Sequence, residues 1–421
     1  MALRQSFAAD VILLAGGTTV GQGLTVLAAP VLTRIYTPEA FGRIGLFMAF
    51  IGIASVAASL RYETAIVSAR DSKEAAYVAM VSAVLVIPIS VISGLALHAI
   101  IRLSVLGFGG LPGYTALFIF PSLLMTATPV ILRYWCVREH QFAEISQGSL
   151  LQNGGRAVSQ IGLGFFGLGW IGLLWGDLLG RALGLARMAR SAWRAIADQL
   201  FPLEYSLLFK VMYVYCKCPI YSFPSALLDA LALNLFIPLI AQFYGSNAAG
   251  QISLVQGALS LPLILVGAAV ADVFHGRIAD CARQAPDRAM SLFLRTAAWL
   301  LIVGCGPAVL LMLFGQSLFG WVFGERWSMA GLLAATMAPW TLAQLVVSPL
   351  SRVIFVYQRH EVKLVYDTMS LLGVAGVIVI GSRQGLSLPQ VVAWLSLAQV
   401  LVYGLYLLLL VQVVRVRLGV S

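Results

Sequence analysis

The sequence predicts an all-α polytopic membrane protein with about twelve transmembrane helices, arranged in two six-helix lobes that are related by a parallel repeat. Three observations lead to this class: an apolar composition, regularly spaced apolar segments and an internal repeat. Of the 421 residues, 60% are hydrophobic and only 10% are charged, and the mean hydropathy is +0.92. A soluble fold of this length does not bury that much apolar surface, so lipid is expected to cover much of it.

Apolar segments of membrane-spanning length recur along the whole chain. A helix needs about 20 residues to cross the hydrocarbon core, where its backbone must satisfy its own hydrogen bonds. Six such segments fall in each half, so both halves are expected to have the same orientation in the membrane. The twelve predicted spans are 11–32, 43–62, 75–100, 114–133, 145–166, 171–189, 219–243, 248–274, 291–314, 330–354, 362–380 and 389–413.

An internal repeat relates the two halves. Residues 30–46 read PVLTRIYTPEAFGRIGL, and residues 238–254, which lie 208 positions later, read PLIAQFYGSNAAGQISL. Both copies begin with Pro and place Tyr at +6, Gly at +12, Ile at +14 and Leu at +16. Each copy joins the end of one apolar segment to the start of the next. Duplicated membrane halves are typical of transporters, with the substrate path between the halves.

The repeat and a polar stretch near the middle of the chain define the predicted domains. Residues 1–195 form the N-terminal six-helix lobe, and residues 216–421 form the C-terminal six-helix lobe. Residues 196–215 between them carry aromatic side chains among scattered charges, which is typical of a cytoplasmic linker at the membrane interface.

The distribution of Lys and Arg predicts the orientation. With a cytoplasmic N-terminus, 18 of these residues lie on the inner side and only five on the outer side. The five are Arg34, Arg43, Arg102, Arg326 and Arg383. Cytoplasmic loops carry the excess of positive charge in membrane proteins, so both termini are expected to be cytoplasmic. The net charge of +10 follows from this bias and gives no support for a nucleic-acid partner.

Charged side chains within the apolar segments are the candidate functional residues, because such charges are costly in the membrane. Arg61 is expected about 18 residues into an outside-to-inside helix, near the inner mouth of a cleft, where it could bind a phosphate. The alternatives are that it extends to the inner lipid headgroups or pairs with Glu63. Arg156 is expected near the middle of the bilayer, facing either the cleft or a structural ion-pair partner. Arg181 is also expected near the middle of the bilayer and is a further candidate for substrate binding. It follows Asp177 by four residues, so an intrahelical ion pair is the alternative explanation of both charges.

Three further residues complete the candidate site. Arg34 and Arg43 flank the outer turn of the first repeat, where they could receive an anion or anchor helix ends. Asp229 is expected near the centre of the seventh span. A buried carboxylate can take up a proton, so Asp229 is the candidate for ion coupling, and pairing with Arg156 across the cleft is the alternative.

Several segments resemble the bacterial polysaccharide and O-antigen flippases (Wzx-type) of the multidrug/oligosaccharidyl-lipid/polysaccharide exporter superfamily. The first two spans carry GQGLTVLAAPVLTRIYTPEAFGRIGLFMAF followed by SLRYETAIV. The second half carries KCPIYSFPSALLDALALNLFIPLIAQFYGSNAAGQISLVQGALSLPLILVGAAVADVF and SPLSRVIFVYQRHEVKL. Within this resemblance Asp229 stands at a position that the family more often fills with Asn.

The resemblance implies a non-enzymatic flippase of the bacterial cytoplasmic (inner) membrane. Its substrate would be an undecaprenyl-diphosphate-linked oligosaccharide, moved from the inner to the outer leaflet by alternating access. Membrane lipids, a glycan polymerase and other surface-polysaccharide assembly proteins are the implied partners. No cofactor is expected, and neither a metal-ligand cluster nor a GxxxxGK[ST] nucleotide loop is present in the sequence.

Two alternatives remain. One is a drug/cation antiporter of the same superfamily, against which the cationic residues Arg61 and Arg156 argue. The other is a polytopic glycan polymerase or ligase, against which the short outer loops argue, since such an enzyme needs a loop to hold an acceptor.

Overall fold

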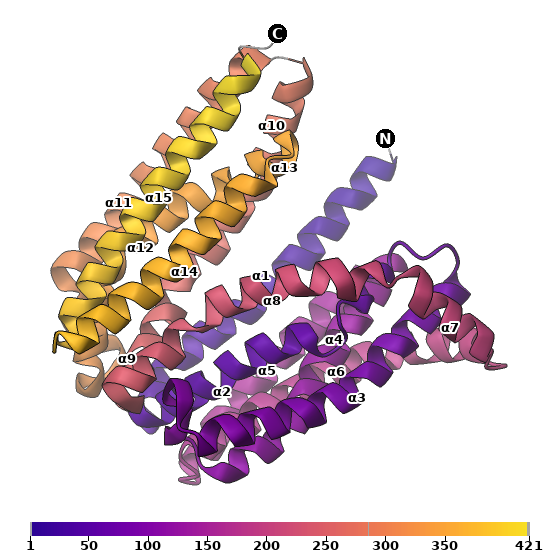
Figure 1. Ribbon diagram of the computed structural model, residues 1–421, viewed down its shortest axis with the longest axis horizontal. Coiled ribbons are helices and arrows are strands. Elements are labelled where there is room, and N and C mark those ends of the chain that lie inside the picture. Colours follow the sequence, from indigo (N-terminus) through magenta and orange to yellow (C-terminus); the bar gives the residue numbers. More distant parts are fainter. Residues whose placement is uncertain (1, 285, 419–421) are drawn as a thin grey trace. The chain divides into compact units, whose positions relative to one another are not determined.

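The computed structural model describes residues 2–284 and 286–418, which form helices and turns with no β-strand among them (Figure 1). The predicted all-α polytopic class is confirmed. Contacts divide the chain into two compact units, Met1–Ser246 (unit 1) and Asn247–Ser421 (unit 2).

Unit 1 contains eight α-helices and the first part of a ninth, with short 3₁₀ and π turns between them. The α-helices are α1 (Ala2–Ile35), α2 (Pro38–Ala57), α3 (Ser72–Arg102), α4 (Ile119–Arg138), α5 (Phe142–Phe165), α6 (Trp170–Leu200), α7 (Tyr205–Val214), α8 (Phe223–Asn234) and α9 (Phe236–Pro262). The shorter turns are η1 (Tyr62–Ala65), η2 (Val105–Gly110), η3 (Gly113–Phe118) and η4 (Cys218–Ser222).

Glycines bring α5 close to both α1 and α6. The helix α6 carries glycine at every fourth position, Gly172, Gly176, Gly180 and Gly184, which places these residues along one face. A Cβ atom at Gly180 would lie only 2.6 Å from the backbone nitrogen of Arg156 on α5. On α1, a Cβ atom at Gly21 would lie 2.9 Å from the side-chain nitrogen of Asn153. Small residues thus let three helix backbones approach closely, as is common between membrane helices.

The segment after α6 folds back against the start of α3. The backbone amide of Glu204 donates to the Tyr77 hydroxyl at 2.6 Å, and the Glu204 carboxylate pairs with Lys73 at 2.6 Å. Burial and the nearby Glu74 carboxylate raise the pKa of Tyr215, which keeps this phenol neutral. The predicted linker 196–215 therefore contains the end of α6 and all of α7, and it packs on α3.

Unit 2 contains the rest of α9 and six further α-helices. These are α10 (Ala268–Gln284), α11 (Pro286–Phe323), α12 (Ser328–Leu350), α13 (Val353–Tyr357), α14 (His360–Arg383) and α15 (Leu388–Leu418). A π turn, η5 (Leu263–Gly267), joins α9 to α10, and a 3₁₀ turn, η6 (Glu325–Trp327), joins α11 to α12. The core of unit 2 lies where α10, α11, α12 and α15 pack together around Phe293 and Leu350.

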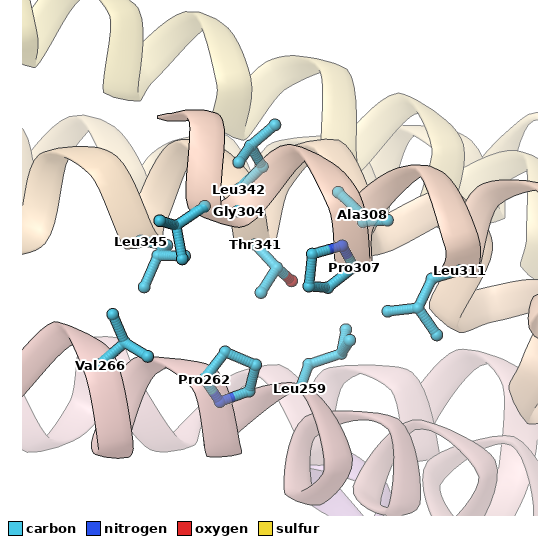
Figure 2. Close-up of a pocket in the computed structure, with 12 residues that line it drawn as sticks. Leu259, Pro262, Val266, Gly304, Pro307, Ala308, Leu311, Thr341, Leu342 and Leu345 are labelled. Carbon is cyan, nitrogen blue, oxygen red and sulfur yellow. The ribbon is translucent and has the colours of Figure 1, made fainter. Parts of the chain in front are cut away.

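A small apolar crevice of about 90 Å³ separates the α9–η5 junction from α11 and α12 (Figure 2). Leu259 and Pro262 lie on one side, and Pro307 and Thr341 lie on the other. The one hydroxyl in the lining is satisfied, since Thr341 donates to the Met337 carbonyl at 3.1 Å. Proline cannot donate a backbone hydrogen bond, and the π turn begins directly after Pro262, so regular α-helical bonding is interrupted at this crevice.

The predicted spans coincide with helices, although hydropathy alone does not identify all of them. Eight helical segments of the described chain are long and apolar enough to cross a membrane, and one of these, Cys218–Pro262, has 45 residues and covers one predicted span and the first part of the next. The helices at the three remaining predicted spans, α1, α5 and α6, are not among the eight. Helices α5 and α6 fall short because they carry glycine and charged or amide side chains, which pack against protein.

The two copies of the sequence repeat form the same kind of junction. In the first copy α1 ends at Ile35 and α2 begins at Pro38, so Tyr36 lies in the short turn between the two helices. In the second copy Tyr244 precedes Gly245, whose φ of 84° breaks α9 into two helices. Each following helix buries its repeat glycine, Gly42 or Gly250. The predicted superposition of the two halves by a rotation about the membrane normal stays a prediction.

Candidate functional site

Three charged side chains on α5 and α6 form the candidate site. The Asp177 carboxylate accepts from Arg181 Nε at 2.6 Å through Oδ2, and its Oδ1 lies 3.7 Å from Arg156 Nη1. The intrahelical pair expected between Asp177 and Arg181 is therefore present. One carboxylate faces two guanidinium groups, so these three side chains carry a surplus of positive charge.

Polar side chains from α1, α4 and α5 complete the cluster. Arg156 Nη2 donates to the hydroxyl of Thr25 on α1 at 2.9 Å and to Asn153 Oδ1 at 3.3 Å. Arg181 Nη1 donates to the hydroxyl of Thr126 on α4 at 2.9 Å. The cluster thus ties α5 and α6 to α1 and α4.

Burial separates the roles of the two arginines. The Asp177 side chain is only 4% exposed and the Arg181 side chain 16%, whereas that of Arg156 is 25% exposed. Arg181 is also held by the shorter contact. Arg181 is thus the closer partner of Asp177, whereas Arg156 has more exposed surface and a longer ion-pair distance.

Close helix packing creates this arrangement. Because α6 presents glycine at position 180, its backbone touches α5 at Arg156, and Asp177, one turn earlier, comes level with the guanidinium. A second contact between the same helices fixes their register, since the amide of Gln160 donates to the Leu173 carbonyl at 2.9 Å.

Arg61 lies outside a helix, which corrects the sequence-based expectation. The helix α2 ends at Ala57, and Arg61 stands in the turn before η1 with φ of 65°. The chain reverses here because Leu60 and Arg61 both adopt the left-handed conformation, and the buried Glu63 carboxylate accepts from the Ser59 hydroxyl. The Arg61 guanidinium lies 3.6 Å from Glu63, the pairing considered as its alternative.

The outer-turn arginines occupy the α1–α2 junction. Arg43 pairs with Glu39 across one turn of α2 at 2.7 Å, and Arg34 is an exposed residue in the last turn of α1. Between them Tyr36 is buried and donates its hydroxyl to the Gln160 carbonyl on α5 at 2.7 Å. Burial raises the pKa of Tyr36 to about 12, so the hydroxyl remains a donor at neutral pH. The binding roles of Arg34 and Arg43 stay predictions.

Asp229 is an exposed residue of α8, a helix that packs on α2 within unit 1. A Cβ atom at Gly52 of α2 would lie 2.5 Å from the Asn234 side chain, so the two helices touch. The carboxylate beside Arg156 is Asp177 and belongs to the same unit. The ion-coupling role of Asp229 stays a prediction.

Sequence reasoning did not identify Thr25, Thr126 and Asn153. Asn153 precedes Arg156 by three residues and therefore shares its helix face, which is a signal that could have been used. The two threonines carry no such signal, because threonine is common in membrane helices. Among the described residues, no group of three or more His, Cys, Asp and Glu side chains could hold a metal ion.

Residues 31–331 match the family model described as polysaccharide biosynthesis protein. The chain belongs to this family. The match covers both copies of the repeat apart from Pro30, and it covers α2 to α11. It also covers Arg156, Asp177 and Arg181, so these residues lie within the region that defines membership. A comparison with functionally curated proteins found no match.

Similar solved structures identify the fold of this chain. The lipid II flippase MurJ, in an inward closed conformation, is similar with a TM-score of 0.72 and 14% identity over 94% of this chain and 87% of the other. An inward-facing MATE multidrug transporter of the MOP superfamily gives a TM-score of 0.68 with 15% identity over 98% of this chain and 99% of the other. A MOP superfamily transporter from Pyrococcus furiosus gives 0.58 with 16% identity over 97% and 96%. This multi-pass membrane protein therefore has the MOP transporter fold.

Proposed function

We propose that this protein is an alternating-access flippase that moves an undecaprenyl-diphosphate-linked oligosaccharide from the inner to the outer leaflet of the bacterial cytoplasmic membrane. The observation that carries the proposal is the surplus guanidinium charge of the Arg156–Asp177–Arg181 cluster within a membrane unit. An intramembrane charge of this kind marks a substrate path by default. Membership of a polysaccharide biosynthesis family and structural likeness to a lipid II flippase support the same substrate class.

In this proposal Arg156 binds the diphosphate. A guanidinium matches phosphate oxygens with paired N–H donors, and Arg156 has the exposed surface to do so. Asp177 stays balanced by Arg181 when Arg156 turns toward the anion. The hydrogen bond from Arg156 to Thr25 would then be exchanged for one to phosphate, which links binding to the position of α1.

Replacing Arg156 tests the site. Arg156→Ala should reduce glycan export by about tenfold or more, because a lost charge-assisted hydrogen bond is worth about 1.5–3 kcal/mol. The amount of inserted protein should stay normal, since Asp177 keeps Arg181. Arg156→Lys should recover export only in part, because an ammonium lacks the two-pronged geometry. Export is measured as surface glycan per membrane-inserted protein.

The control is Arg283→Ala, which removes an exposed arginine paired with Asp280 and should leave export unchanged. Normal export from the Arg156→Ala protein would contradict the assignment of this residue to substrate binding. Parallel replacement of Arg61 tests whether the guanidinium beside Glu63 contributes at loading.

A proton gradient is the proposed driving force, with Asp229 as the coupling group. If the carboxylate exchanges a proton, Asp229→Asn should abolish the dependence of transport on the proton gradient and retain substrate binding, because Asn is neutral at every pH. The bias that a proton supplies is about 1.4 kcal/mol per unit of pKa difference between the two states. Transport into vesicles with and without a pH difference measures this, and unchanged gradient dependence would eliminate the role.

The proposed orientation places both termini in the cytoplasm, on the evidence of the Lys and Arg bias. Reporters fused at residues 168 and 245 should then lie on the outer side of the membrane, and reporters fused at residues 195 and 415 should lie on the cytoplasmic side. An extracellular reporter at residue 195 would contradict the orientation.

A drug/cation antiporter is the second candidate, and the specific observation in its favour is the likeness to MATE multidrug transporters. A cationic drug would be repelled by the arginine surplus. This candidate would be favoured if drug efflux persists in cells that lack the glycan carrier lipid and is faster with the Arg156→Ala protein.

A further inference from the structure

A groove of about 660 Å³ runs along the second half of α3 in unit 1, bounded by η3 and the start of α4. Its walls are apolar and open to the surroundings, because Leu95 is 68% exposed and Leu117 is 77% exposed. Phe120 and Val91 continue the same surface. The volume is several times that of the ~150 Å³ cavity that holds one benzene molecule.

The length of the groove matches one leaflet. Ser90 lies at one end and Arg102 at the other, and twelve helical residues at 1.5 Å each span about 18 Å. Half of a bilayer's hydrocarbon core is about 15 Å thick. A chain lying in the groove would therefore extend from the membrane surface to the middle of the bilayer.

Positive charge is confined to the surface end. Arg102 and His98 line the groove one helical turn apart, and both side chains are exposed. Neither takes part in an ion pair among the contacts of the described residues. The predicted orientation places this end of α3 at the outer membrane surface.

An aromatic pair marks the same level of the membrane. Tyr114 of the groove stacks on Trp170 at the start of α6, with ring centroids 6.2 Å apart and planes inclined by 22°. Tyr and Trp are enriched where membrane proteins meet the headgroup region. The guanidinium of Arg102 is therefore expected at the depth of lipid phosphates.

We infer that this groove binds one anionic phospholipid of the outer leaflet, with its phosphodiester at Arg102 and His98 and one acyl chain along Leu95, Leu117 and Phe120. A single permanent positive charge matches a phosphodiester, which carries one negative charge, better than it matches a diphosphate. Lipid binding here does not depend on the proposed transport activity, because the groove lies apart from the Arg156 cluster. Only the assignment to the outer leaflet rests on the proposed orientation.

Lipid titration of the purified full-length protein tests the inference, with native mass spectrometry as the readout. Phosphatidylglycerol should bind at one site more tightly than phosphatidylcholine. Arg102→Gln should weaken phosphatidylglycerol binding by about tenfold and leave phosphatidylcholine binding unchanged, since one charge-assisted contact is lost. Leu117→Trp should weaken the binding of both lipids, because the indole occupies the chain path.

Arg383→Gln is the matched control, since Arg383 is also an exposed arginine in the last turn of a helix and lines no part of this groove. This variant should bind both lipids like the unaltered protein. If Arg102→Gln and Arg383→Gln weaken phosphatidylglycerol binding equally, the proposed site is wrong and the lipid is attracted only by positive charge in general. Displacement of phosphatidylglycerol by an equal concentration of a prenyl diphosphate would also overturn it, by assigning the groove to the carrier lipid.

Discussion

Asp177→Ala should destabilise unit 1 by about 3–5 kcal/mol, because it leaves two guanidinium groups in a largely buried cluster without their carboxylate. Arg181 would lose a 2.6 Å contact and keep its hydrogen bonds to the Thr126 hydroxyl and the sulfur of Met48. We expect a lower yield of folded protein and a lower midpoint of thermal unfolding in detergent.

Asp280→Ala is the control, because Asp280 also pairs with an arginine but is exposed on α10. Exposed ion pairs contribute little, so this variant should change stability by no more than about 0.5 kcal/mol. The double variant Asp177→Ala/Arg156→Met should recover part of the loss by removing one unpaired charge. Equal stability of the Asp177→Ala and Asp280→Ala proteins would show that the cluster does not hold the helices together.

Gly180→Ala is the second change with a large expected effect. A single methyl group at this position would lie 2.6 Å from the nitrogen of Arg156 and 2.6 Å from the Gln152 carbonyl oxygen. Both are backbone atoms, so the helices themselves must move apart. Such overpacking costs about 1–3 kcal/mol. Separation of α5 and α6 would also lengthen the Arg156–Asp177 contact, so export per folded molecule should fall as well.

The same substitution at Gly162 provides the control. Gly162 lies in the last turn of α5, and nothing stands within 4 Å of the position that a Cβ would take. Alanine is the better helix former by about 1 kcal/mol, so Gly162→Ala should leave stability equal or slightly higher. If both variants unfold at the same temperature, then close approach of α5 and α6 is not what Gly180 provides.

The fold class could be predicted from the sequence, because hydropathy and the internal repeat directly indicate the membrane-spanning segments. All twelve predicted segments fall on helices, and the repeat tyrosines Tyr36 and Tyr244 both stand at junctions between helices. The predicted span 43–62 was wrong at its end, because α2 already ends at Ala57. Apolar residues continue past Ala57, so composition gave no sign of the left-handed turn at Leu60 and Arg61.

The candidate site was harder to predict, because a sequence pattern fixes the depth of a residue but not its neighbours on other helices. The contact between Asp177 and Arg181 lies within one helix and follows from four-residue spacing alone. The contact of Arg156 with Asp177 depends on how α5 and α6 are rotated and how closely they approach. That geometry is set by the glycine face of α6 and becomes visible only in three dimensions.

The limited hydropathy of α5 and α6 has a consequence for biogenesis. An arginine or aspartate at the centre of a helix costs about 2.5–3.5 kcal/mol during insertion by the translocon, so neither helix is well suited to enter lipid alone. Only four residues, 166–169, separate the two helices, and their charges meet within 3.7 Å. Entry as a preformed helical hairpin would neutralise Asp177 before lipid surrounds it, so we expect α5 and α6 to enter the membrane together and not one after the other.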